Sequence, residues 1–342
     1  MKTILVTGGA GFIGSRFVRY LLNGYPDYRV IVVDALNYAG DPDNLTEEVR
    51  NDPRFSFWWG NVRNAELVYD LVAMSDVVVH FAAESHVARS IYDNTTFFET
   101  DVLGTQTVAN AVLKHGDRVE RFVHISTSEV YGTALAEPMS EEHPLNPLTP
   151  YASAKAGADR LVYSYWATYD LPAVIIRPFN NYGPNQHLEK VVPRFITAAL
   201  RDKPLTVHGD GASERDWLFV DDHCQALDKV LHADMKALKG QCINLGTGIA
   251  TSVLEIARLV LEMLGKPESL IQHIGDRPGQ VRKHIASTEK ARRLLNWQAT
   301  STLADGLART IAWYEANPAW WERRLWMTSV PIKTRDGRIE QH

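Results

Sequence analysis

Short apolar runs recur along the first half of the chain, separated by longer segments in which apolar residues are spaced. The runs comprise residues 4–6, 30–33, 77–81, 122–125 and 174–176. Each is too short for a helix, and each is continuously hydrophobic, as is typical of strands buried on both faces of a sheet. The intervening segments, for example residues 12–22 and 96–113, have the spacing of helices. This alternation predicts an α/β fold with a parallel sheet and helices on both of its sides.

The pattern changes after about residue 178. Prolines and glycines interrupt the chain, and apolar runs become sparse, with examples at residues 205–207 and 242–245. Helical spacing returns at residues 253–264, 288–295 and 303–314. We therefore expect two parts, residues 1–178 with the parallel sheet and residues 179–342 as a smaller mixed α/β lobe, with segments that can interleave.

Composition excludes several classes of protein. The 342 residues are 45% hydrophobic and carry a formal net charge of −5, which does not favour nucleic acid or an anionic membrane as a partner. The two cysteines and the lack of a Cys/His cluster argue against a disulfide scaffold and predict no metal site. No apolar run approaches the roughly 18 residues that span a bilayer, and the first residues lack the features of a signal peptide. The expected location is the cytoplasm.

A glycine-rich turn follows the first apolar run. Gly8, Gly11 and Gly14 form a G-x-x-G-x-x-G pattern between a predicted strand and a predicted helix. Such glycines permit a tight turn, close approach of backbone to a pyrophosphate, and close packing of helix on strand. The amino end of the helix then offers N–H groups to the phosphates. In this context the pattern predicts a Rossmann-type, doubly wound parallel sheet that binds a dinucleotide.

The second apolar run ends at Asp34, which lies 20 residues after Gly14. An acid at this position accepts hydrogen bonds from the ribose hydroxyls and repels a 2′-phosphate, so we expect NAD and not NADP. Asn61 is expected to contact the adenine edge. The residues predicted to bind the cofactor are Gly8, Gly11, Phe12, Ile13, Gly14, Asp34, Asn61, Ala82, Tyr151 and Lys155.

Tyr151 and Lys155 form a Tyr-x-x-x-Lys pair on one face of a predicted helix. The pKa of a phenol is about 10, which is too high for a base at neutral pH. An adjacent ammonium lowers this pKa, and so does the positive charge of oxidised nicotinamide. The pair is therefore expected to accept a proton from a sugar hydroxyl while hydride passes to NAD.

A cluster of hydroxyl and carboxylate side chains follows the run at residues 122–125. Thr127 lies just past the predicted strand, where open α/β sheets bind their ligands, and can hydrogen-bond the reacting hydroxyl. Glu129 is a candidate base for a carbon acid at the same edge of the sheet. Ser128 lies between these two residues, and the candidate catalytic residues are Thr127, Ser128, Glu129, Tyr151 and Lys155.

Further motifs accompany this constellation and carry a family resemblance. They are D-A-L-N-Y-A-G at residues 34–40, A-A-E-S-H-V-A-R-S-I at 82–91, N-N-Y-G-P at 180–184, E-K at 189–190, R-D-W-L at 215–218 and D-R-P-G at 276–279. Over its length to about Trp313 the chain resembles the extended short-chain dehydrogenase/reductases that act on nucleotide sugars. Within that group it is most similar to the dTDP-glucose 4,6-dehydratases.

The resemblance implies a reaction in which bound NAD oxidises the 4-hydroxyl of a nucleotide sugar. The ketone acidifies carbon 5, water is lost across carbons 5 and 6, and hydride returns to carbon 6. It implies that Tyr151 is the base at the 4-hydroxyl, tuned by Lys155, that Thr127 orients this hydroxyl, and that Glu129 takes the carbon-5 proton. The residues implied to contact the substrate are Glu84, Ser85, His86, Asn180, Asn181, Glu189, Lys190, Arg215 and Arg282. Among these, Lys190, Arg215 and Arg282 are expected to pair with the diphosphate.

One departure from the family concerns Ser128. The dTDP-glucose enzymes carry Thr-Asp-Glu where this chain has Thr-Ser-Glu, and that aspartate protonates the departing 6-hydroxyl. A serine is too weak an acid for this step, which is worth roughly 10²–10⁴-fold. Ala88 likewise replaces an aspartate of the family motif.

Thr-Ser-Glu occurs in two related groups, so two reactions stay open. GDP-mannose 4,6-dehydratases dehydrate without the aspartate, whereas UDP-glucuronate decarboxylases lose carbon dioxide, and Arg282 would then hold the substrate carboxylate. The Glu-Ser-His-Val-x-Arg-Ser motif favours a 4,6-dehydratase, because the familiar decarboxylases lack it. A 4-epimerase and a non-catalytic dinucleotide sensor are less favoured, since Glu129, Tyr151 and Lys155 are all present. The family also implies a homodimer formed through residues 96–113 and 152–168.

Overall fold

A computed structural model describes residues 1–275, 281–329, 331–333 and 338–341. Its main layer is a parallel sheet of β1 (Lys2–Thr7), β2 (Tyr28–Asp34), β3 (Phe55–Trp59), β4 (Val77–His80), β5 (Arg121–Ile125), β6 (Ala173–Pro178) and β10 (Cys242–Leu245). Within the described residues, the strand order is β10-β6-β5-β4-β1-β2-β3. The chain therefore winds outward in both directions from the boundary between β1 and β4, and the predicted doubly wound fold is confirmed.

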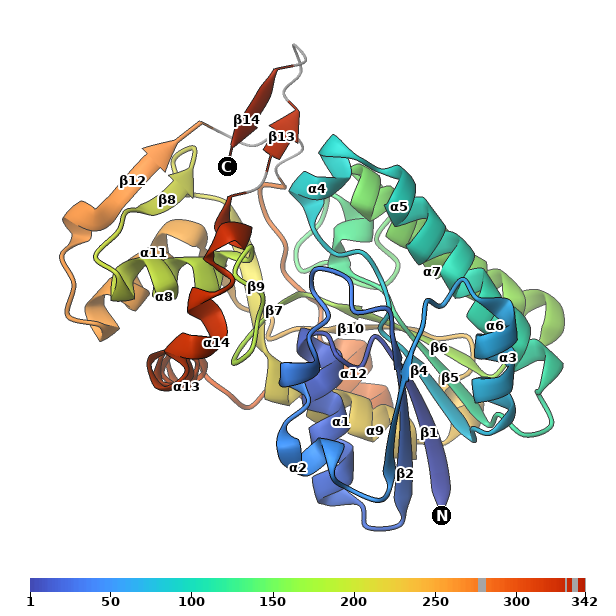
Figure 1. The fold of residues 1–342 in the computed structure, drawn as a ribbon. Coiled ribbons are helices and arrows are strands. Elements are labelled where there is room, and N and C mark those ends of the chain that lie inside the picture. The colour runs from blue at the N-terminus through green and yellow to red at the C-terminus, as the bar shows by residue number, and fades with distance from the viewer. Residues whose placement is uncertain (276–280, 330, 334–337, 342) are drawn as a thin grey trace.

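Helices cover both faces of this sheet (Figure 1). On one face lie α1 (Phe12–Gly24), α9 (Val220–His232) and α12 (Glu289–Leu295), and on the other α3 (Ala65–Ala73), α6 (Thr105–Lys114) and α7 (Pro150–Tyr169). Alternate strand residues enter the two cores: Val30 and Val32 pack on the first face, and Ile31 and Val33 on the second. Burial on both faces explains why these strands have continuous hydrophobic runs.

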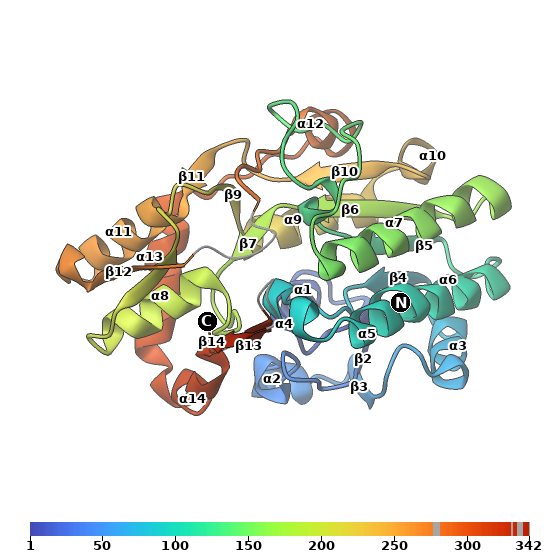
Figure 2. The ribbon, with the colours of Figure 1, turned by 90° about the horizontal axis from the view of Figure 1, so that it is seen from above.

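A smaller lobe lies beside the sheet (Figure 2). It has one small sheet of β7 (Asn180–Tyr182), β9 (Glu214–Phe219) and β11 (Ala250–Ser252), another of β8 (Leu205–His208) and β12 (Ile271–Ile274), and helices α8 (Val191–Leu200), α11 (Val253–Met263), α13 (Leu303–Ala316) and α14 (Pro318–Glu322). Phe195, Ile256 and Leu307 belong to its own buried core.

The remaining elements are α2 (Glu47–Arg50), α4 (Val87–Tyr92), α5 (Thr95–Phe97), α10 (Met235–Leu238), β13 (Pro331–Lys333), β14 (Ile339–Gln341), and the short turns η1 (Pro42–Asn44), η2 (Phe98–Gly104), η3 (Ser128–Tyr131), η4 (Glu268–Leu270) and η5 (Leu325–Thr328).

The expected strands are all present, and two details differ from expectation. The strand β3 was not predicted, because Trp58 and Trp59 are exposed at the edge of the sheet and break the buried pattern. The helix expected over residues 96–113 is divided into α5, a π-helical turn η2, and α6. The division at residue 178 stays a prediction; β10, α9 and α12 come from beyond it and pack with the main sheet.

A buried ion pair holds α7 against the sheet. In it, Arg177 of β6 donates from Nε and Nη2 to the carboxylate of Asp159 on α7, at 2.8 and 2.9 Å. Arg177 also donates to the hydroxyl of Tyr131, which in turn donates to Asn244 of β10. Burial alone would raise the pKa of Asp159, but the hydrogen bonds and charge of Arg177 outweigh burial and hold this pKa well below its usual range. Because Tyr131 ends η3, the same network also fixes the segment that carries Ser128 and Glu129.

Substitution of Asp159 by Asn is expected to destabilise the protein by about 3–5 kcal/mol, because it leaves the guanidinium of Arg177 buried without a counter-charge. Urea unfolding measures this change. The matched control is Arg160→Gln, since Arg160 also contacts Asp159 but its side chain is 42% exposed. This control should cost less than about 1 kcal/mol. Equal effects of the two substitutions would contradict the assigned role of the buried pair.

Candidate active site

A cavity of about 480 Å³ lies at the carboxyl ends of the central strands, between the sheet and the smaller lobe. Open α/β sheets bind ligands at this place, where the strand order reverses. The glycine turn, Asp34, Thr127, Glu129 and Tyr151 all line the cavity. One continuous site therefore joins the predicted dinucleotide-binding residues to the predicted catalytic residues.

The glycine turn has the close packing that the pattern predicted. Gly8 has a φ of +70°, and a Cβ added there would lie 2.7 Å from the backbone nitrogen of Ala82. A Cβ added at Gly14 would lie 2.3 Å from the carbonyl oxygen of Gly8. Gly11 is the N-cap of α1 and has no side chain to cap the helix, so the first N–H groups are available to a phosphate. Phe12 and Ile13 line the cavity beside them.

Asp34 lies at the end of β2 and is held by two backbone groups. Its carboxylate accepts hydrogen bonds from the N–H of Leu36 at 2.8 Å and of Ala10 at 2.9 Å. Burial raises the pKa of Asp34, and these two hydrogen bonds only partly oppose that effect. Asn61 and Ala82 also line this end of the cavity, where the sequence placed the cofactor.

Replacement of Gly14 by Ala is expected to separate α1 from the glycine turn and to weaken NAD binding strongly, because the new methyl group would overlap the carbonyl of Gly8. Isothermal titration with NAD measures the effect. Gly24 at the other end of α1 has open space around it, so Gly24→Ala should bind NAD as the parent does. Tight NAD binding by the Gly14→Ala protein would contradict this view of the turn.

The first turn of α7 positions the predicted base. Thr149 caps the helix by accepting the N–H of Ala152, and Pro150 occupies its first turn. Tyr151 then hydrogen-bonds Thr127, across from the end of β5. Lys155, one turn later, donates from Nζ to the carbonyl of Ile125 at 2.7 Å. The expected grouping of Thr127, Tyr151 and Lys155 is thus present at one edge of the sheet.

The electrostatic environment of Tyr151 differs from expectation. We expected the adjacent ammonium to lower its pKa, but burial raises the pKa of Tyr151 well above its usual value, and the charges of Asp101 and Glu129 raise it further. The hydrogen bond with Thr127 opposes this rise. The charge of Lys155 interacts with Asp101 and Asp159, and burial lowers the pKa of its ammonium. The positive charge of an oxidised nicotinamide would favour the phenolate in this buried site.

Ser128 is buried and faces His284. Burial lowers the pKa of His284, and its Nε2 lies 2.5 Å from the carbonyl oxygen of Gly132. Since a carbonyl only accepts, Nε2 carries the proton and Nδ1 is the acceptor. The hydroxyl of Ser128, 3.4 Å from Nδ1, therefore donates toward His284. In this orientation the hydroxyl proton of Ser128 points to His284, and the role of Ser128 stays a prediction.

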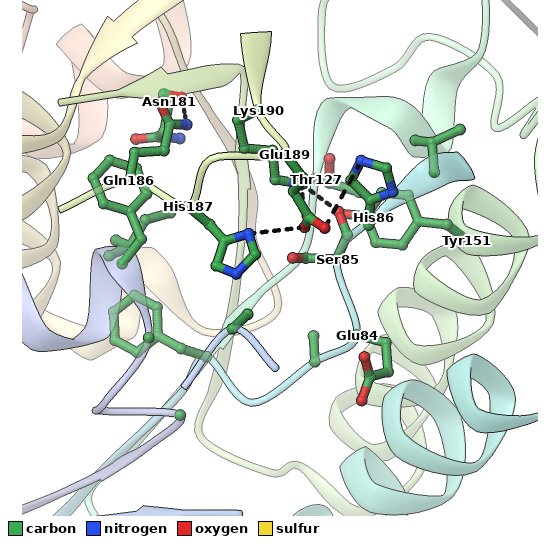
Figure 3. A pocket seen from close by; sticks show the side chains of 18 of the residues that line it. Glu84, Ser85, His86, Thr127, Tyr151, Asn181, Gln186, His187, Glu189 and Lys190 are labelled. Carbon is green, nitrogen blue, oxygen red and sulfur yellow. Dashed lines mark hydrogen bonds and ion pairs between the residues drawn. The ribbon is translucent and has the colours of Figure 1, made fainter. Parts of the chain in front are cut away.

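A cluster of charged groups surrounds Glu189 farther along the cavity (Figure 3). The carboxylate of Glu189 has no exposed surface; it lies 3.1 Å from Nε of Arg89 and 3.7 Å from Nδ1 of His187. Burial opposes its charge, but His86, Lys190, His187 and Arg89 together lower the pKa of Glu189. The pair Glu189–Lys190 and the motif at residues 82–91 therefore meet in space, although Arg89 and Glu189 are 100 positions apart in the sequence.

Other predicted substrate residues also lie along the cavity, with one exception. Glu84, Ser85, Asn180, Asn181 and Arg215 line it. Arg282 is exposed and is not named among the described lining residues, and its expected contact with a phosphate or carboxylate stays a prediction. The D-R-P-G motif at residues 276–279 lies outside the described residues. The roles of the residues that do line the cavity stay predictions.

Sequence reasoning did not name several cavity residues. Tyr38, His187, Arg194, His208 and Ser213 line the cavity without having been named as ligands. Tyr38 and His187 were detectable, because the first lies in the quoted motif at residues 34–40 and the second is two residues before Glu189. Nothing in the sequence around Arg194 or His208 signals a site, since they reach it through the folding of the smaller lobe.

Neither a metal site nor a membrane span is found in the described part of the chain. No group of three or more His, Cys, Asp or Glu side chains in residues 1–275, 281–329, 331–333 and 338–341 is arranged to hold a metal ion. Within the same ranges, no helix has the length and hydrophobicity needed to cross a bilayer.

Comparison with known proteins gives a consistent result. Residues 5–310 match the family described as GDP-mannose 4,6 dehydratase. The chain is 45% identical to the low-salt glycan biosynthesis protein Agl12 of Haloferax volcanii, over 91% of this chain and 98% of that protein. It is 42% identical to a dTDP-glucose 4,6-dehydratase of Actinoplanes, over 93% and 99% of the two chains. The crystal structure of DesIV, a dTDP-glucose 4,6-dehydratase from Streptomyces venezuelae with NAD bound, is 43% identical and superposes with a TM-score of 0.89, covering 94% of this chain and 99% of that one.

Proposed function

The chain belongs to the GDP-mannose 4,6 dehydratase family, and from that premise we propose that it is an NAD-dependent 4,6-dehydratase of a nucleoside diphosphate hexose. We propose dTDP-glucose as the substrate, because two similar proteins named above are dTDP-glucose 4,6-dehydratases. The product would be a 4-keto-6-deoxy sugar that remains attached to the nucleotide.

One observation carries this proposal: Tyr151, Thr127 and Glu129 share a single cavity with the glycine turn and Asp34. Oxidation at carbon 4 followed by water loss requires a base for the 4-hydroxyl, a hydroxyl group that orients the sugar, and a second base for carbon 5. Tyr151 accepts the proton of the 4-hydroxyl, and Thr127, already hydrogen-bonded to Tyr151, holds that hydroxyl in line. Glu129 then takes the carbon-5 proton, which the new ketone has acidified, and returns this proton to the departing 6-hydroxyl, which leaves as water.

The cavity also fits NAD as the group that accepts and returns the hydride. Gly11 at the start of α1 leaves N–H groups for the pyrophosphate, and a side chain at Gly8 or Gly14 would overlap neighbouring backbone and distort this turn. Asp34 offers a buried carboxylate for the ribose hydroxyls, where a 2′-phosphate would meet a like charge. Bound NAD supplies the hydride acceptor, and Tyr151 and Glu129 handle the protons.

The alternative of a UDP-glucuronate decarboxylase has less support. Its argument from sequence rested on Ser128 and on Arg282 as the partner of the substrate carboxylate. Arg282 is exposed and is not named among the described residues that line the cavity, whereas Arg215 is buried and lines it. The motif at residues 82–91, which favours a dehydratase, contributes Glu84, Ser85 and His86 to the lining.

Two substitutions should block the reaction at different steps. Tyr151→Phe should abolish reduction of the nicotinamide when dTDP-glucose is added, with a loss of about 10²–10⁴-fold in rate. Glu129→Gln should still reduce the nicotinamide but should form no 4-keto-6-deoxy product, because no group then takes the carbon-5 proton. Absorbance of the reduced cofactor and mass spectrometry of the sugar nucleotide follow the two steps.

The control for this pair is Tyr169→Phe, an exposed tyrosine at the end of α7, which should behave as the parent. UDP-glucose, GDP-mannose and UDP-glucuronate are tested in parallel with dTDP-glucose. Loss of carbon dioxide from UDP-glucuronate, with every hexose left unchanged, would contradict the dehydratase and establish the alternative. Full turnover by Tyr151→Phe would contradict the assigned base and support a non-catalytic role.

We further propose a homodimer formed by η2, α6 and α7, in a cytoplasmic protein. Phe98 and Leu103 on η2 and Tyr163 on α7 expose large apolar surfaces. Such surfaces are typical of protein interfaces. Both cysteines, Cys224 and Cys242, are free and buried, which suits a reducing compartment.

Light scattering after gel filtration should give twice the 38.4 kDa mass of the chain. Leu103→Arg should reduce the mass to that of a monomer, because it places a charge in the proposed interface. Leu135→Arg is the matched control, since Leu135 is 70% exposed on a loop outside these helices. A dimer that persists in the Leu103→Arg protein at low concentration would exclude this interface.

A further inference from the structure

The C-terminal part of the described chain crosses from the smaller lobe to the cofactor end of the cavity. Helix α14 and the turn η5 follow α13, and β13 then lies against α4 (Figure 2). These elements lie beyond residue 310, where the match to the family ends. Two of their side chains, Trp320 and Arg324, nevertheless line the cavity. Residues 318–329, named the C-terminal segment below, therefore reach the candidate active site.

The start of the C-terminal segment is built into the smaller lobe. Trp321 is 4% exposed and belongs to the core of that lobe. Its indole nitrogen donates to the carbonyl of Tyr314 on α13 at 2.8 Å. The neighbouring ring of Trp320 packs edge-on against that of Trp313, with 5.0 Å between the ring centroids. The segment is therefore fixed to α13.

Two adjacent arginines connect the C-terminal segment to the loop that follows β2. Arg324 is buried, its guanidinium lies 4.3 Å from the centre of the Trp320 ring, and its Nη1 donates to the carbonyl of Trp320. Its Nη2 forms an ion pair with the carboxylate of Asp41. Arg323 pairs with Asp43, but these two side chains are 54% and 46% exposed. The more buried pair, Arg324–Asp41, is the stronger link, because water weakens exposed ion pairs.

Asp41 belongs to a loop that returns to the predicted contacts of NAD. The loop leaves the sheet after Asp34, and a Cβ added at Gly40 would lie 2.6 Å from Oδ1 of Asp34. The N–H of Asp41 donates to the carbonyl of Ala10 in the glycine turn at 3.1 Å. The side chain of Asn44 donates to the same carbonyl at 2.9 Å. The partner of the buried arginine therefore lies against both the acid expected at the ribose and the turn expected at the pyrophosphate.

A second link joins the same loop to the smaller lobe. Nε2 of His187 lies 3.1 Å from the carbonyl oxygen of Tyr38, and because a carbonyl only accepts, this nitrogen is the donor. The rings of His187 and Tyr38 also meet edge-on. The guanidinium of Arg89 lies 4.2 Å from the centre of the Tyr38 ring and donates to Glu189. The smaller lobe therefore holds this loop at Tyr38 as well as at Asp41.

The proposed reaction makes retention of the cofactor necessary. Hydride taken from carbon 4 returns to carbon 6 only after water has been lost, so the reduced cofactor has to stay bound between the two transfers. Its escape would leave a ketone intermediate without a hydride donor. Fastening the loop that lies on the ribose and pyrophosphate contacts opposes such an escape.

We propose that Arg324 is a positioning residue for the cofactor: by pairing with Asp41 it fastens the loop after β2 to the smaller lobe and keeps NAD in the cavity from one hydride transfer to the next. This inference rests on the proposed function for the need to hold the reduced cofactor. It deepens that function by assigning cofactor retention to the C-terminal segment.

The test compares release of the reduced cofactor from the full-length parent and from Arg324→Gln. Each protein is loaded with NADH and mixed with excess NAD, and the fall in nicotinamide fluorescence gives the dissociation rate. Release from Arg324→Gln should be about tenfold faster or more, because loss of one partner of a buried charge pair acts mainly on dissociation.

The matched control is Arg323→Gln, which removes the neighbouring charge. Its pair with Asp43 is exposed, so its dissociation rate should stay within about threefold of the parent's rate. Equal rates in the parent and Arg324→Gln, or equal acceleration by both substitutions, would overturn the inference.

A double-mutant cycle separates the pairing from a merely structural role of Arg324. Asp41→Asn should also speed release, and the double variant Arg324→Gln/Asp41→Asn should be no faster than the faster single variant, because both substitutions break one link. The double variant leaves neither charge without its partner, so it is compared directly with the parent if a single variant folds poorly, and about tenfold faster release is again expected. Effects that multiply in the double variant would show that Arg324 acts by packing on Trp320, and would refute the pairing.

These rates also separate the inference from the proposed function, because they are measured without a sugar nucleotide. If no nucleotide hexose is converted, the proposed function fails, and the rates still test the link from Arg324 to Asp41. Unchanged release from Arg324→Gln would refute this link even if the parent is an active dehydratase. Where the parent is active, Arg324→Gln should lose rate during turnover of dTDP-glucose, and added NAD should restore it.

Discussion

The protein buries the ammonium group of Lys155 at the end of its central sheet, and the groups around this charge make its burial tolerable. An unpaired ammonium transferred to the interior costs several kcal/mol. Here it donates to the carbonyl of Ile125 and interacts with Asp101 and Asp159, which come from two sides. Tyr151 lies one helical turn away, beside Thr127. The buried ammonium and the predicted base therefore lie on one helix, at the edge of the sheet where Thr127 is found.

This arrangement connects strands β6 and β10 and helix α7 to the turn that carries Glu129. Asp159 is fixed by Arg177 of β6, and Arg177 reaches Asn244 of β10 through Tyr131. Tyr131 ends the turn that begins with Ser128. The central sheet, the catalytic helix and the turn with Glu129 are thus held by one buried polar network, so a change in any member affects the site as well as stability.

Much of this could be predicted from the sequence, where local signals were strong. Continuous apolar runs indicated the strands, and three glycines in the context of strand and helix indicated the turn that the structure contains. What escaped prediction depends on three-dimensional context. Asp101 lies in an ordinary helical pattern, and only the fold reveals that this acid is buried. Arg282 resembled a phosphate ligand by its sequence context, but it is exposed in the folded chain. The expectation of a lowered pKa for Tyr151 was wrong for the same reason. Burial and neighbouring acids raise this pKa, and neither can be seen from a Tyr-x-x-x-Lys spacing.

The central claim is that hydride leaves carbon 4 of the sugar and returns to carbon 6 within one active site, while Tyr151 and Glu129 move the protons. The most direct measurement follows the deuterium of dTDP-glucose labelled at carbon 4, by NMR and mass spectrometry of the product. The account predicts a 4-keto-6-deoxy product that carries the deuterium at carbon 6. Deuterium found at carbon 4 of a hexose that has kept its 6-hydroxyl, or deuterium lost from the sugar altogether, would contradict this transfer of hydride from carbon 4 to carbon 6.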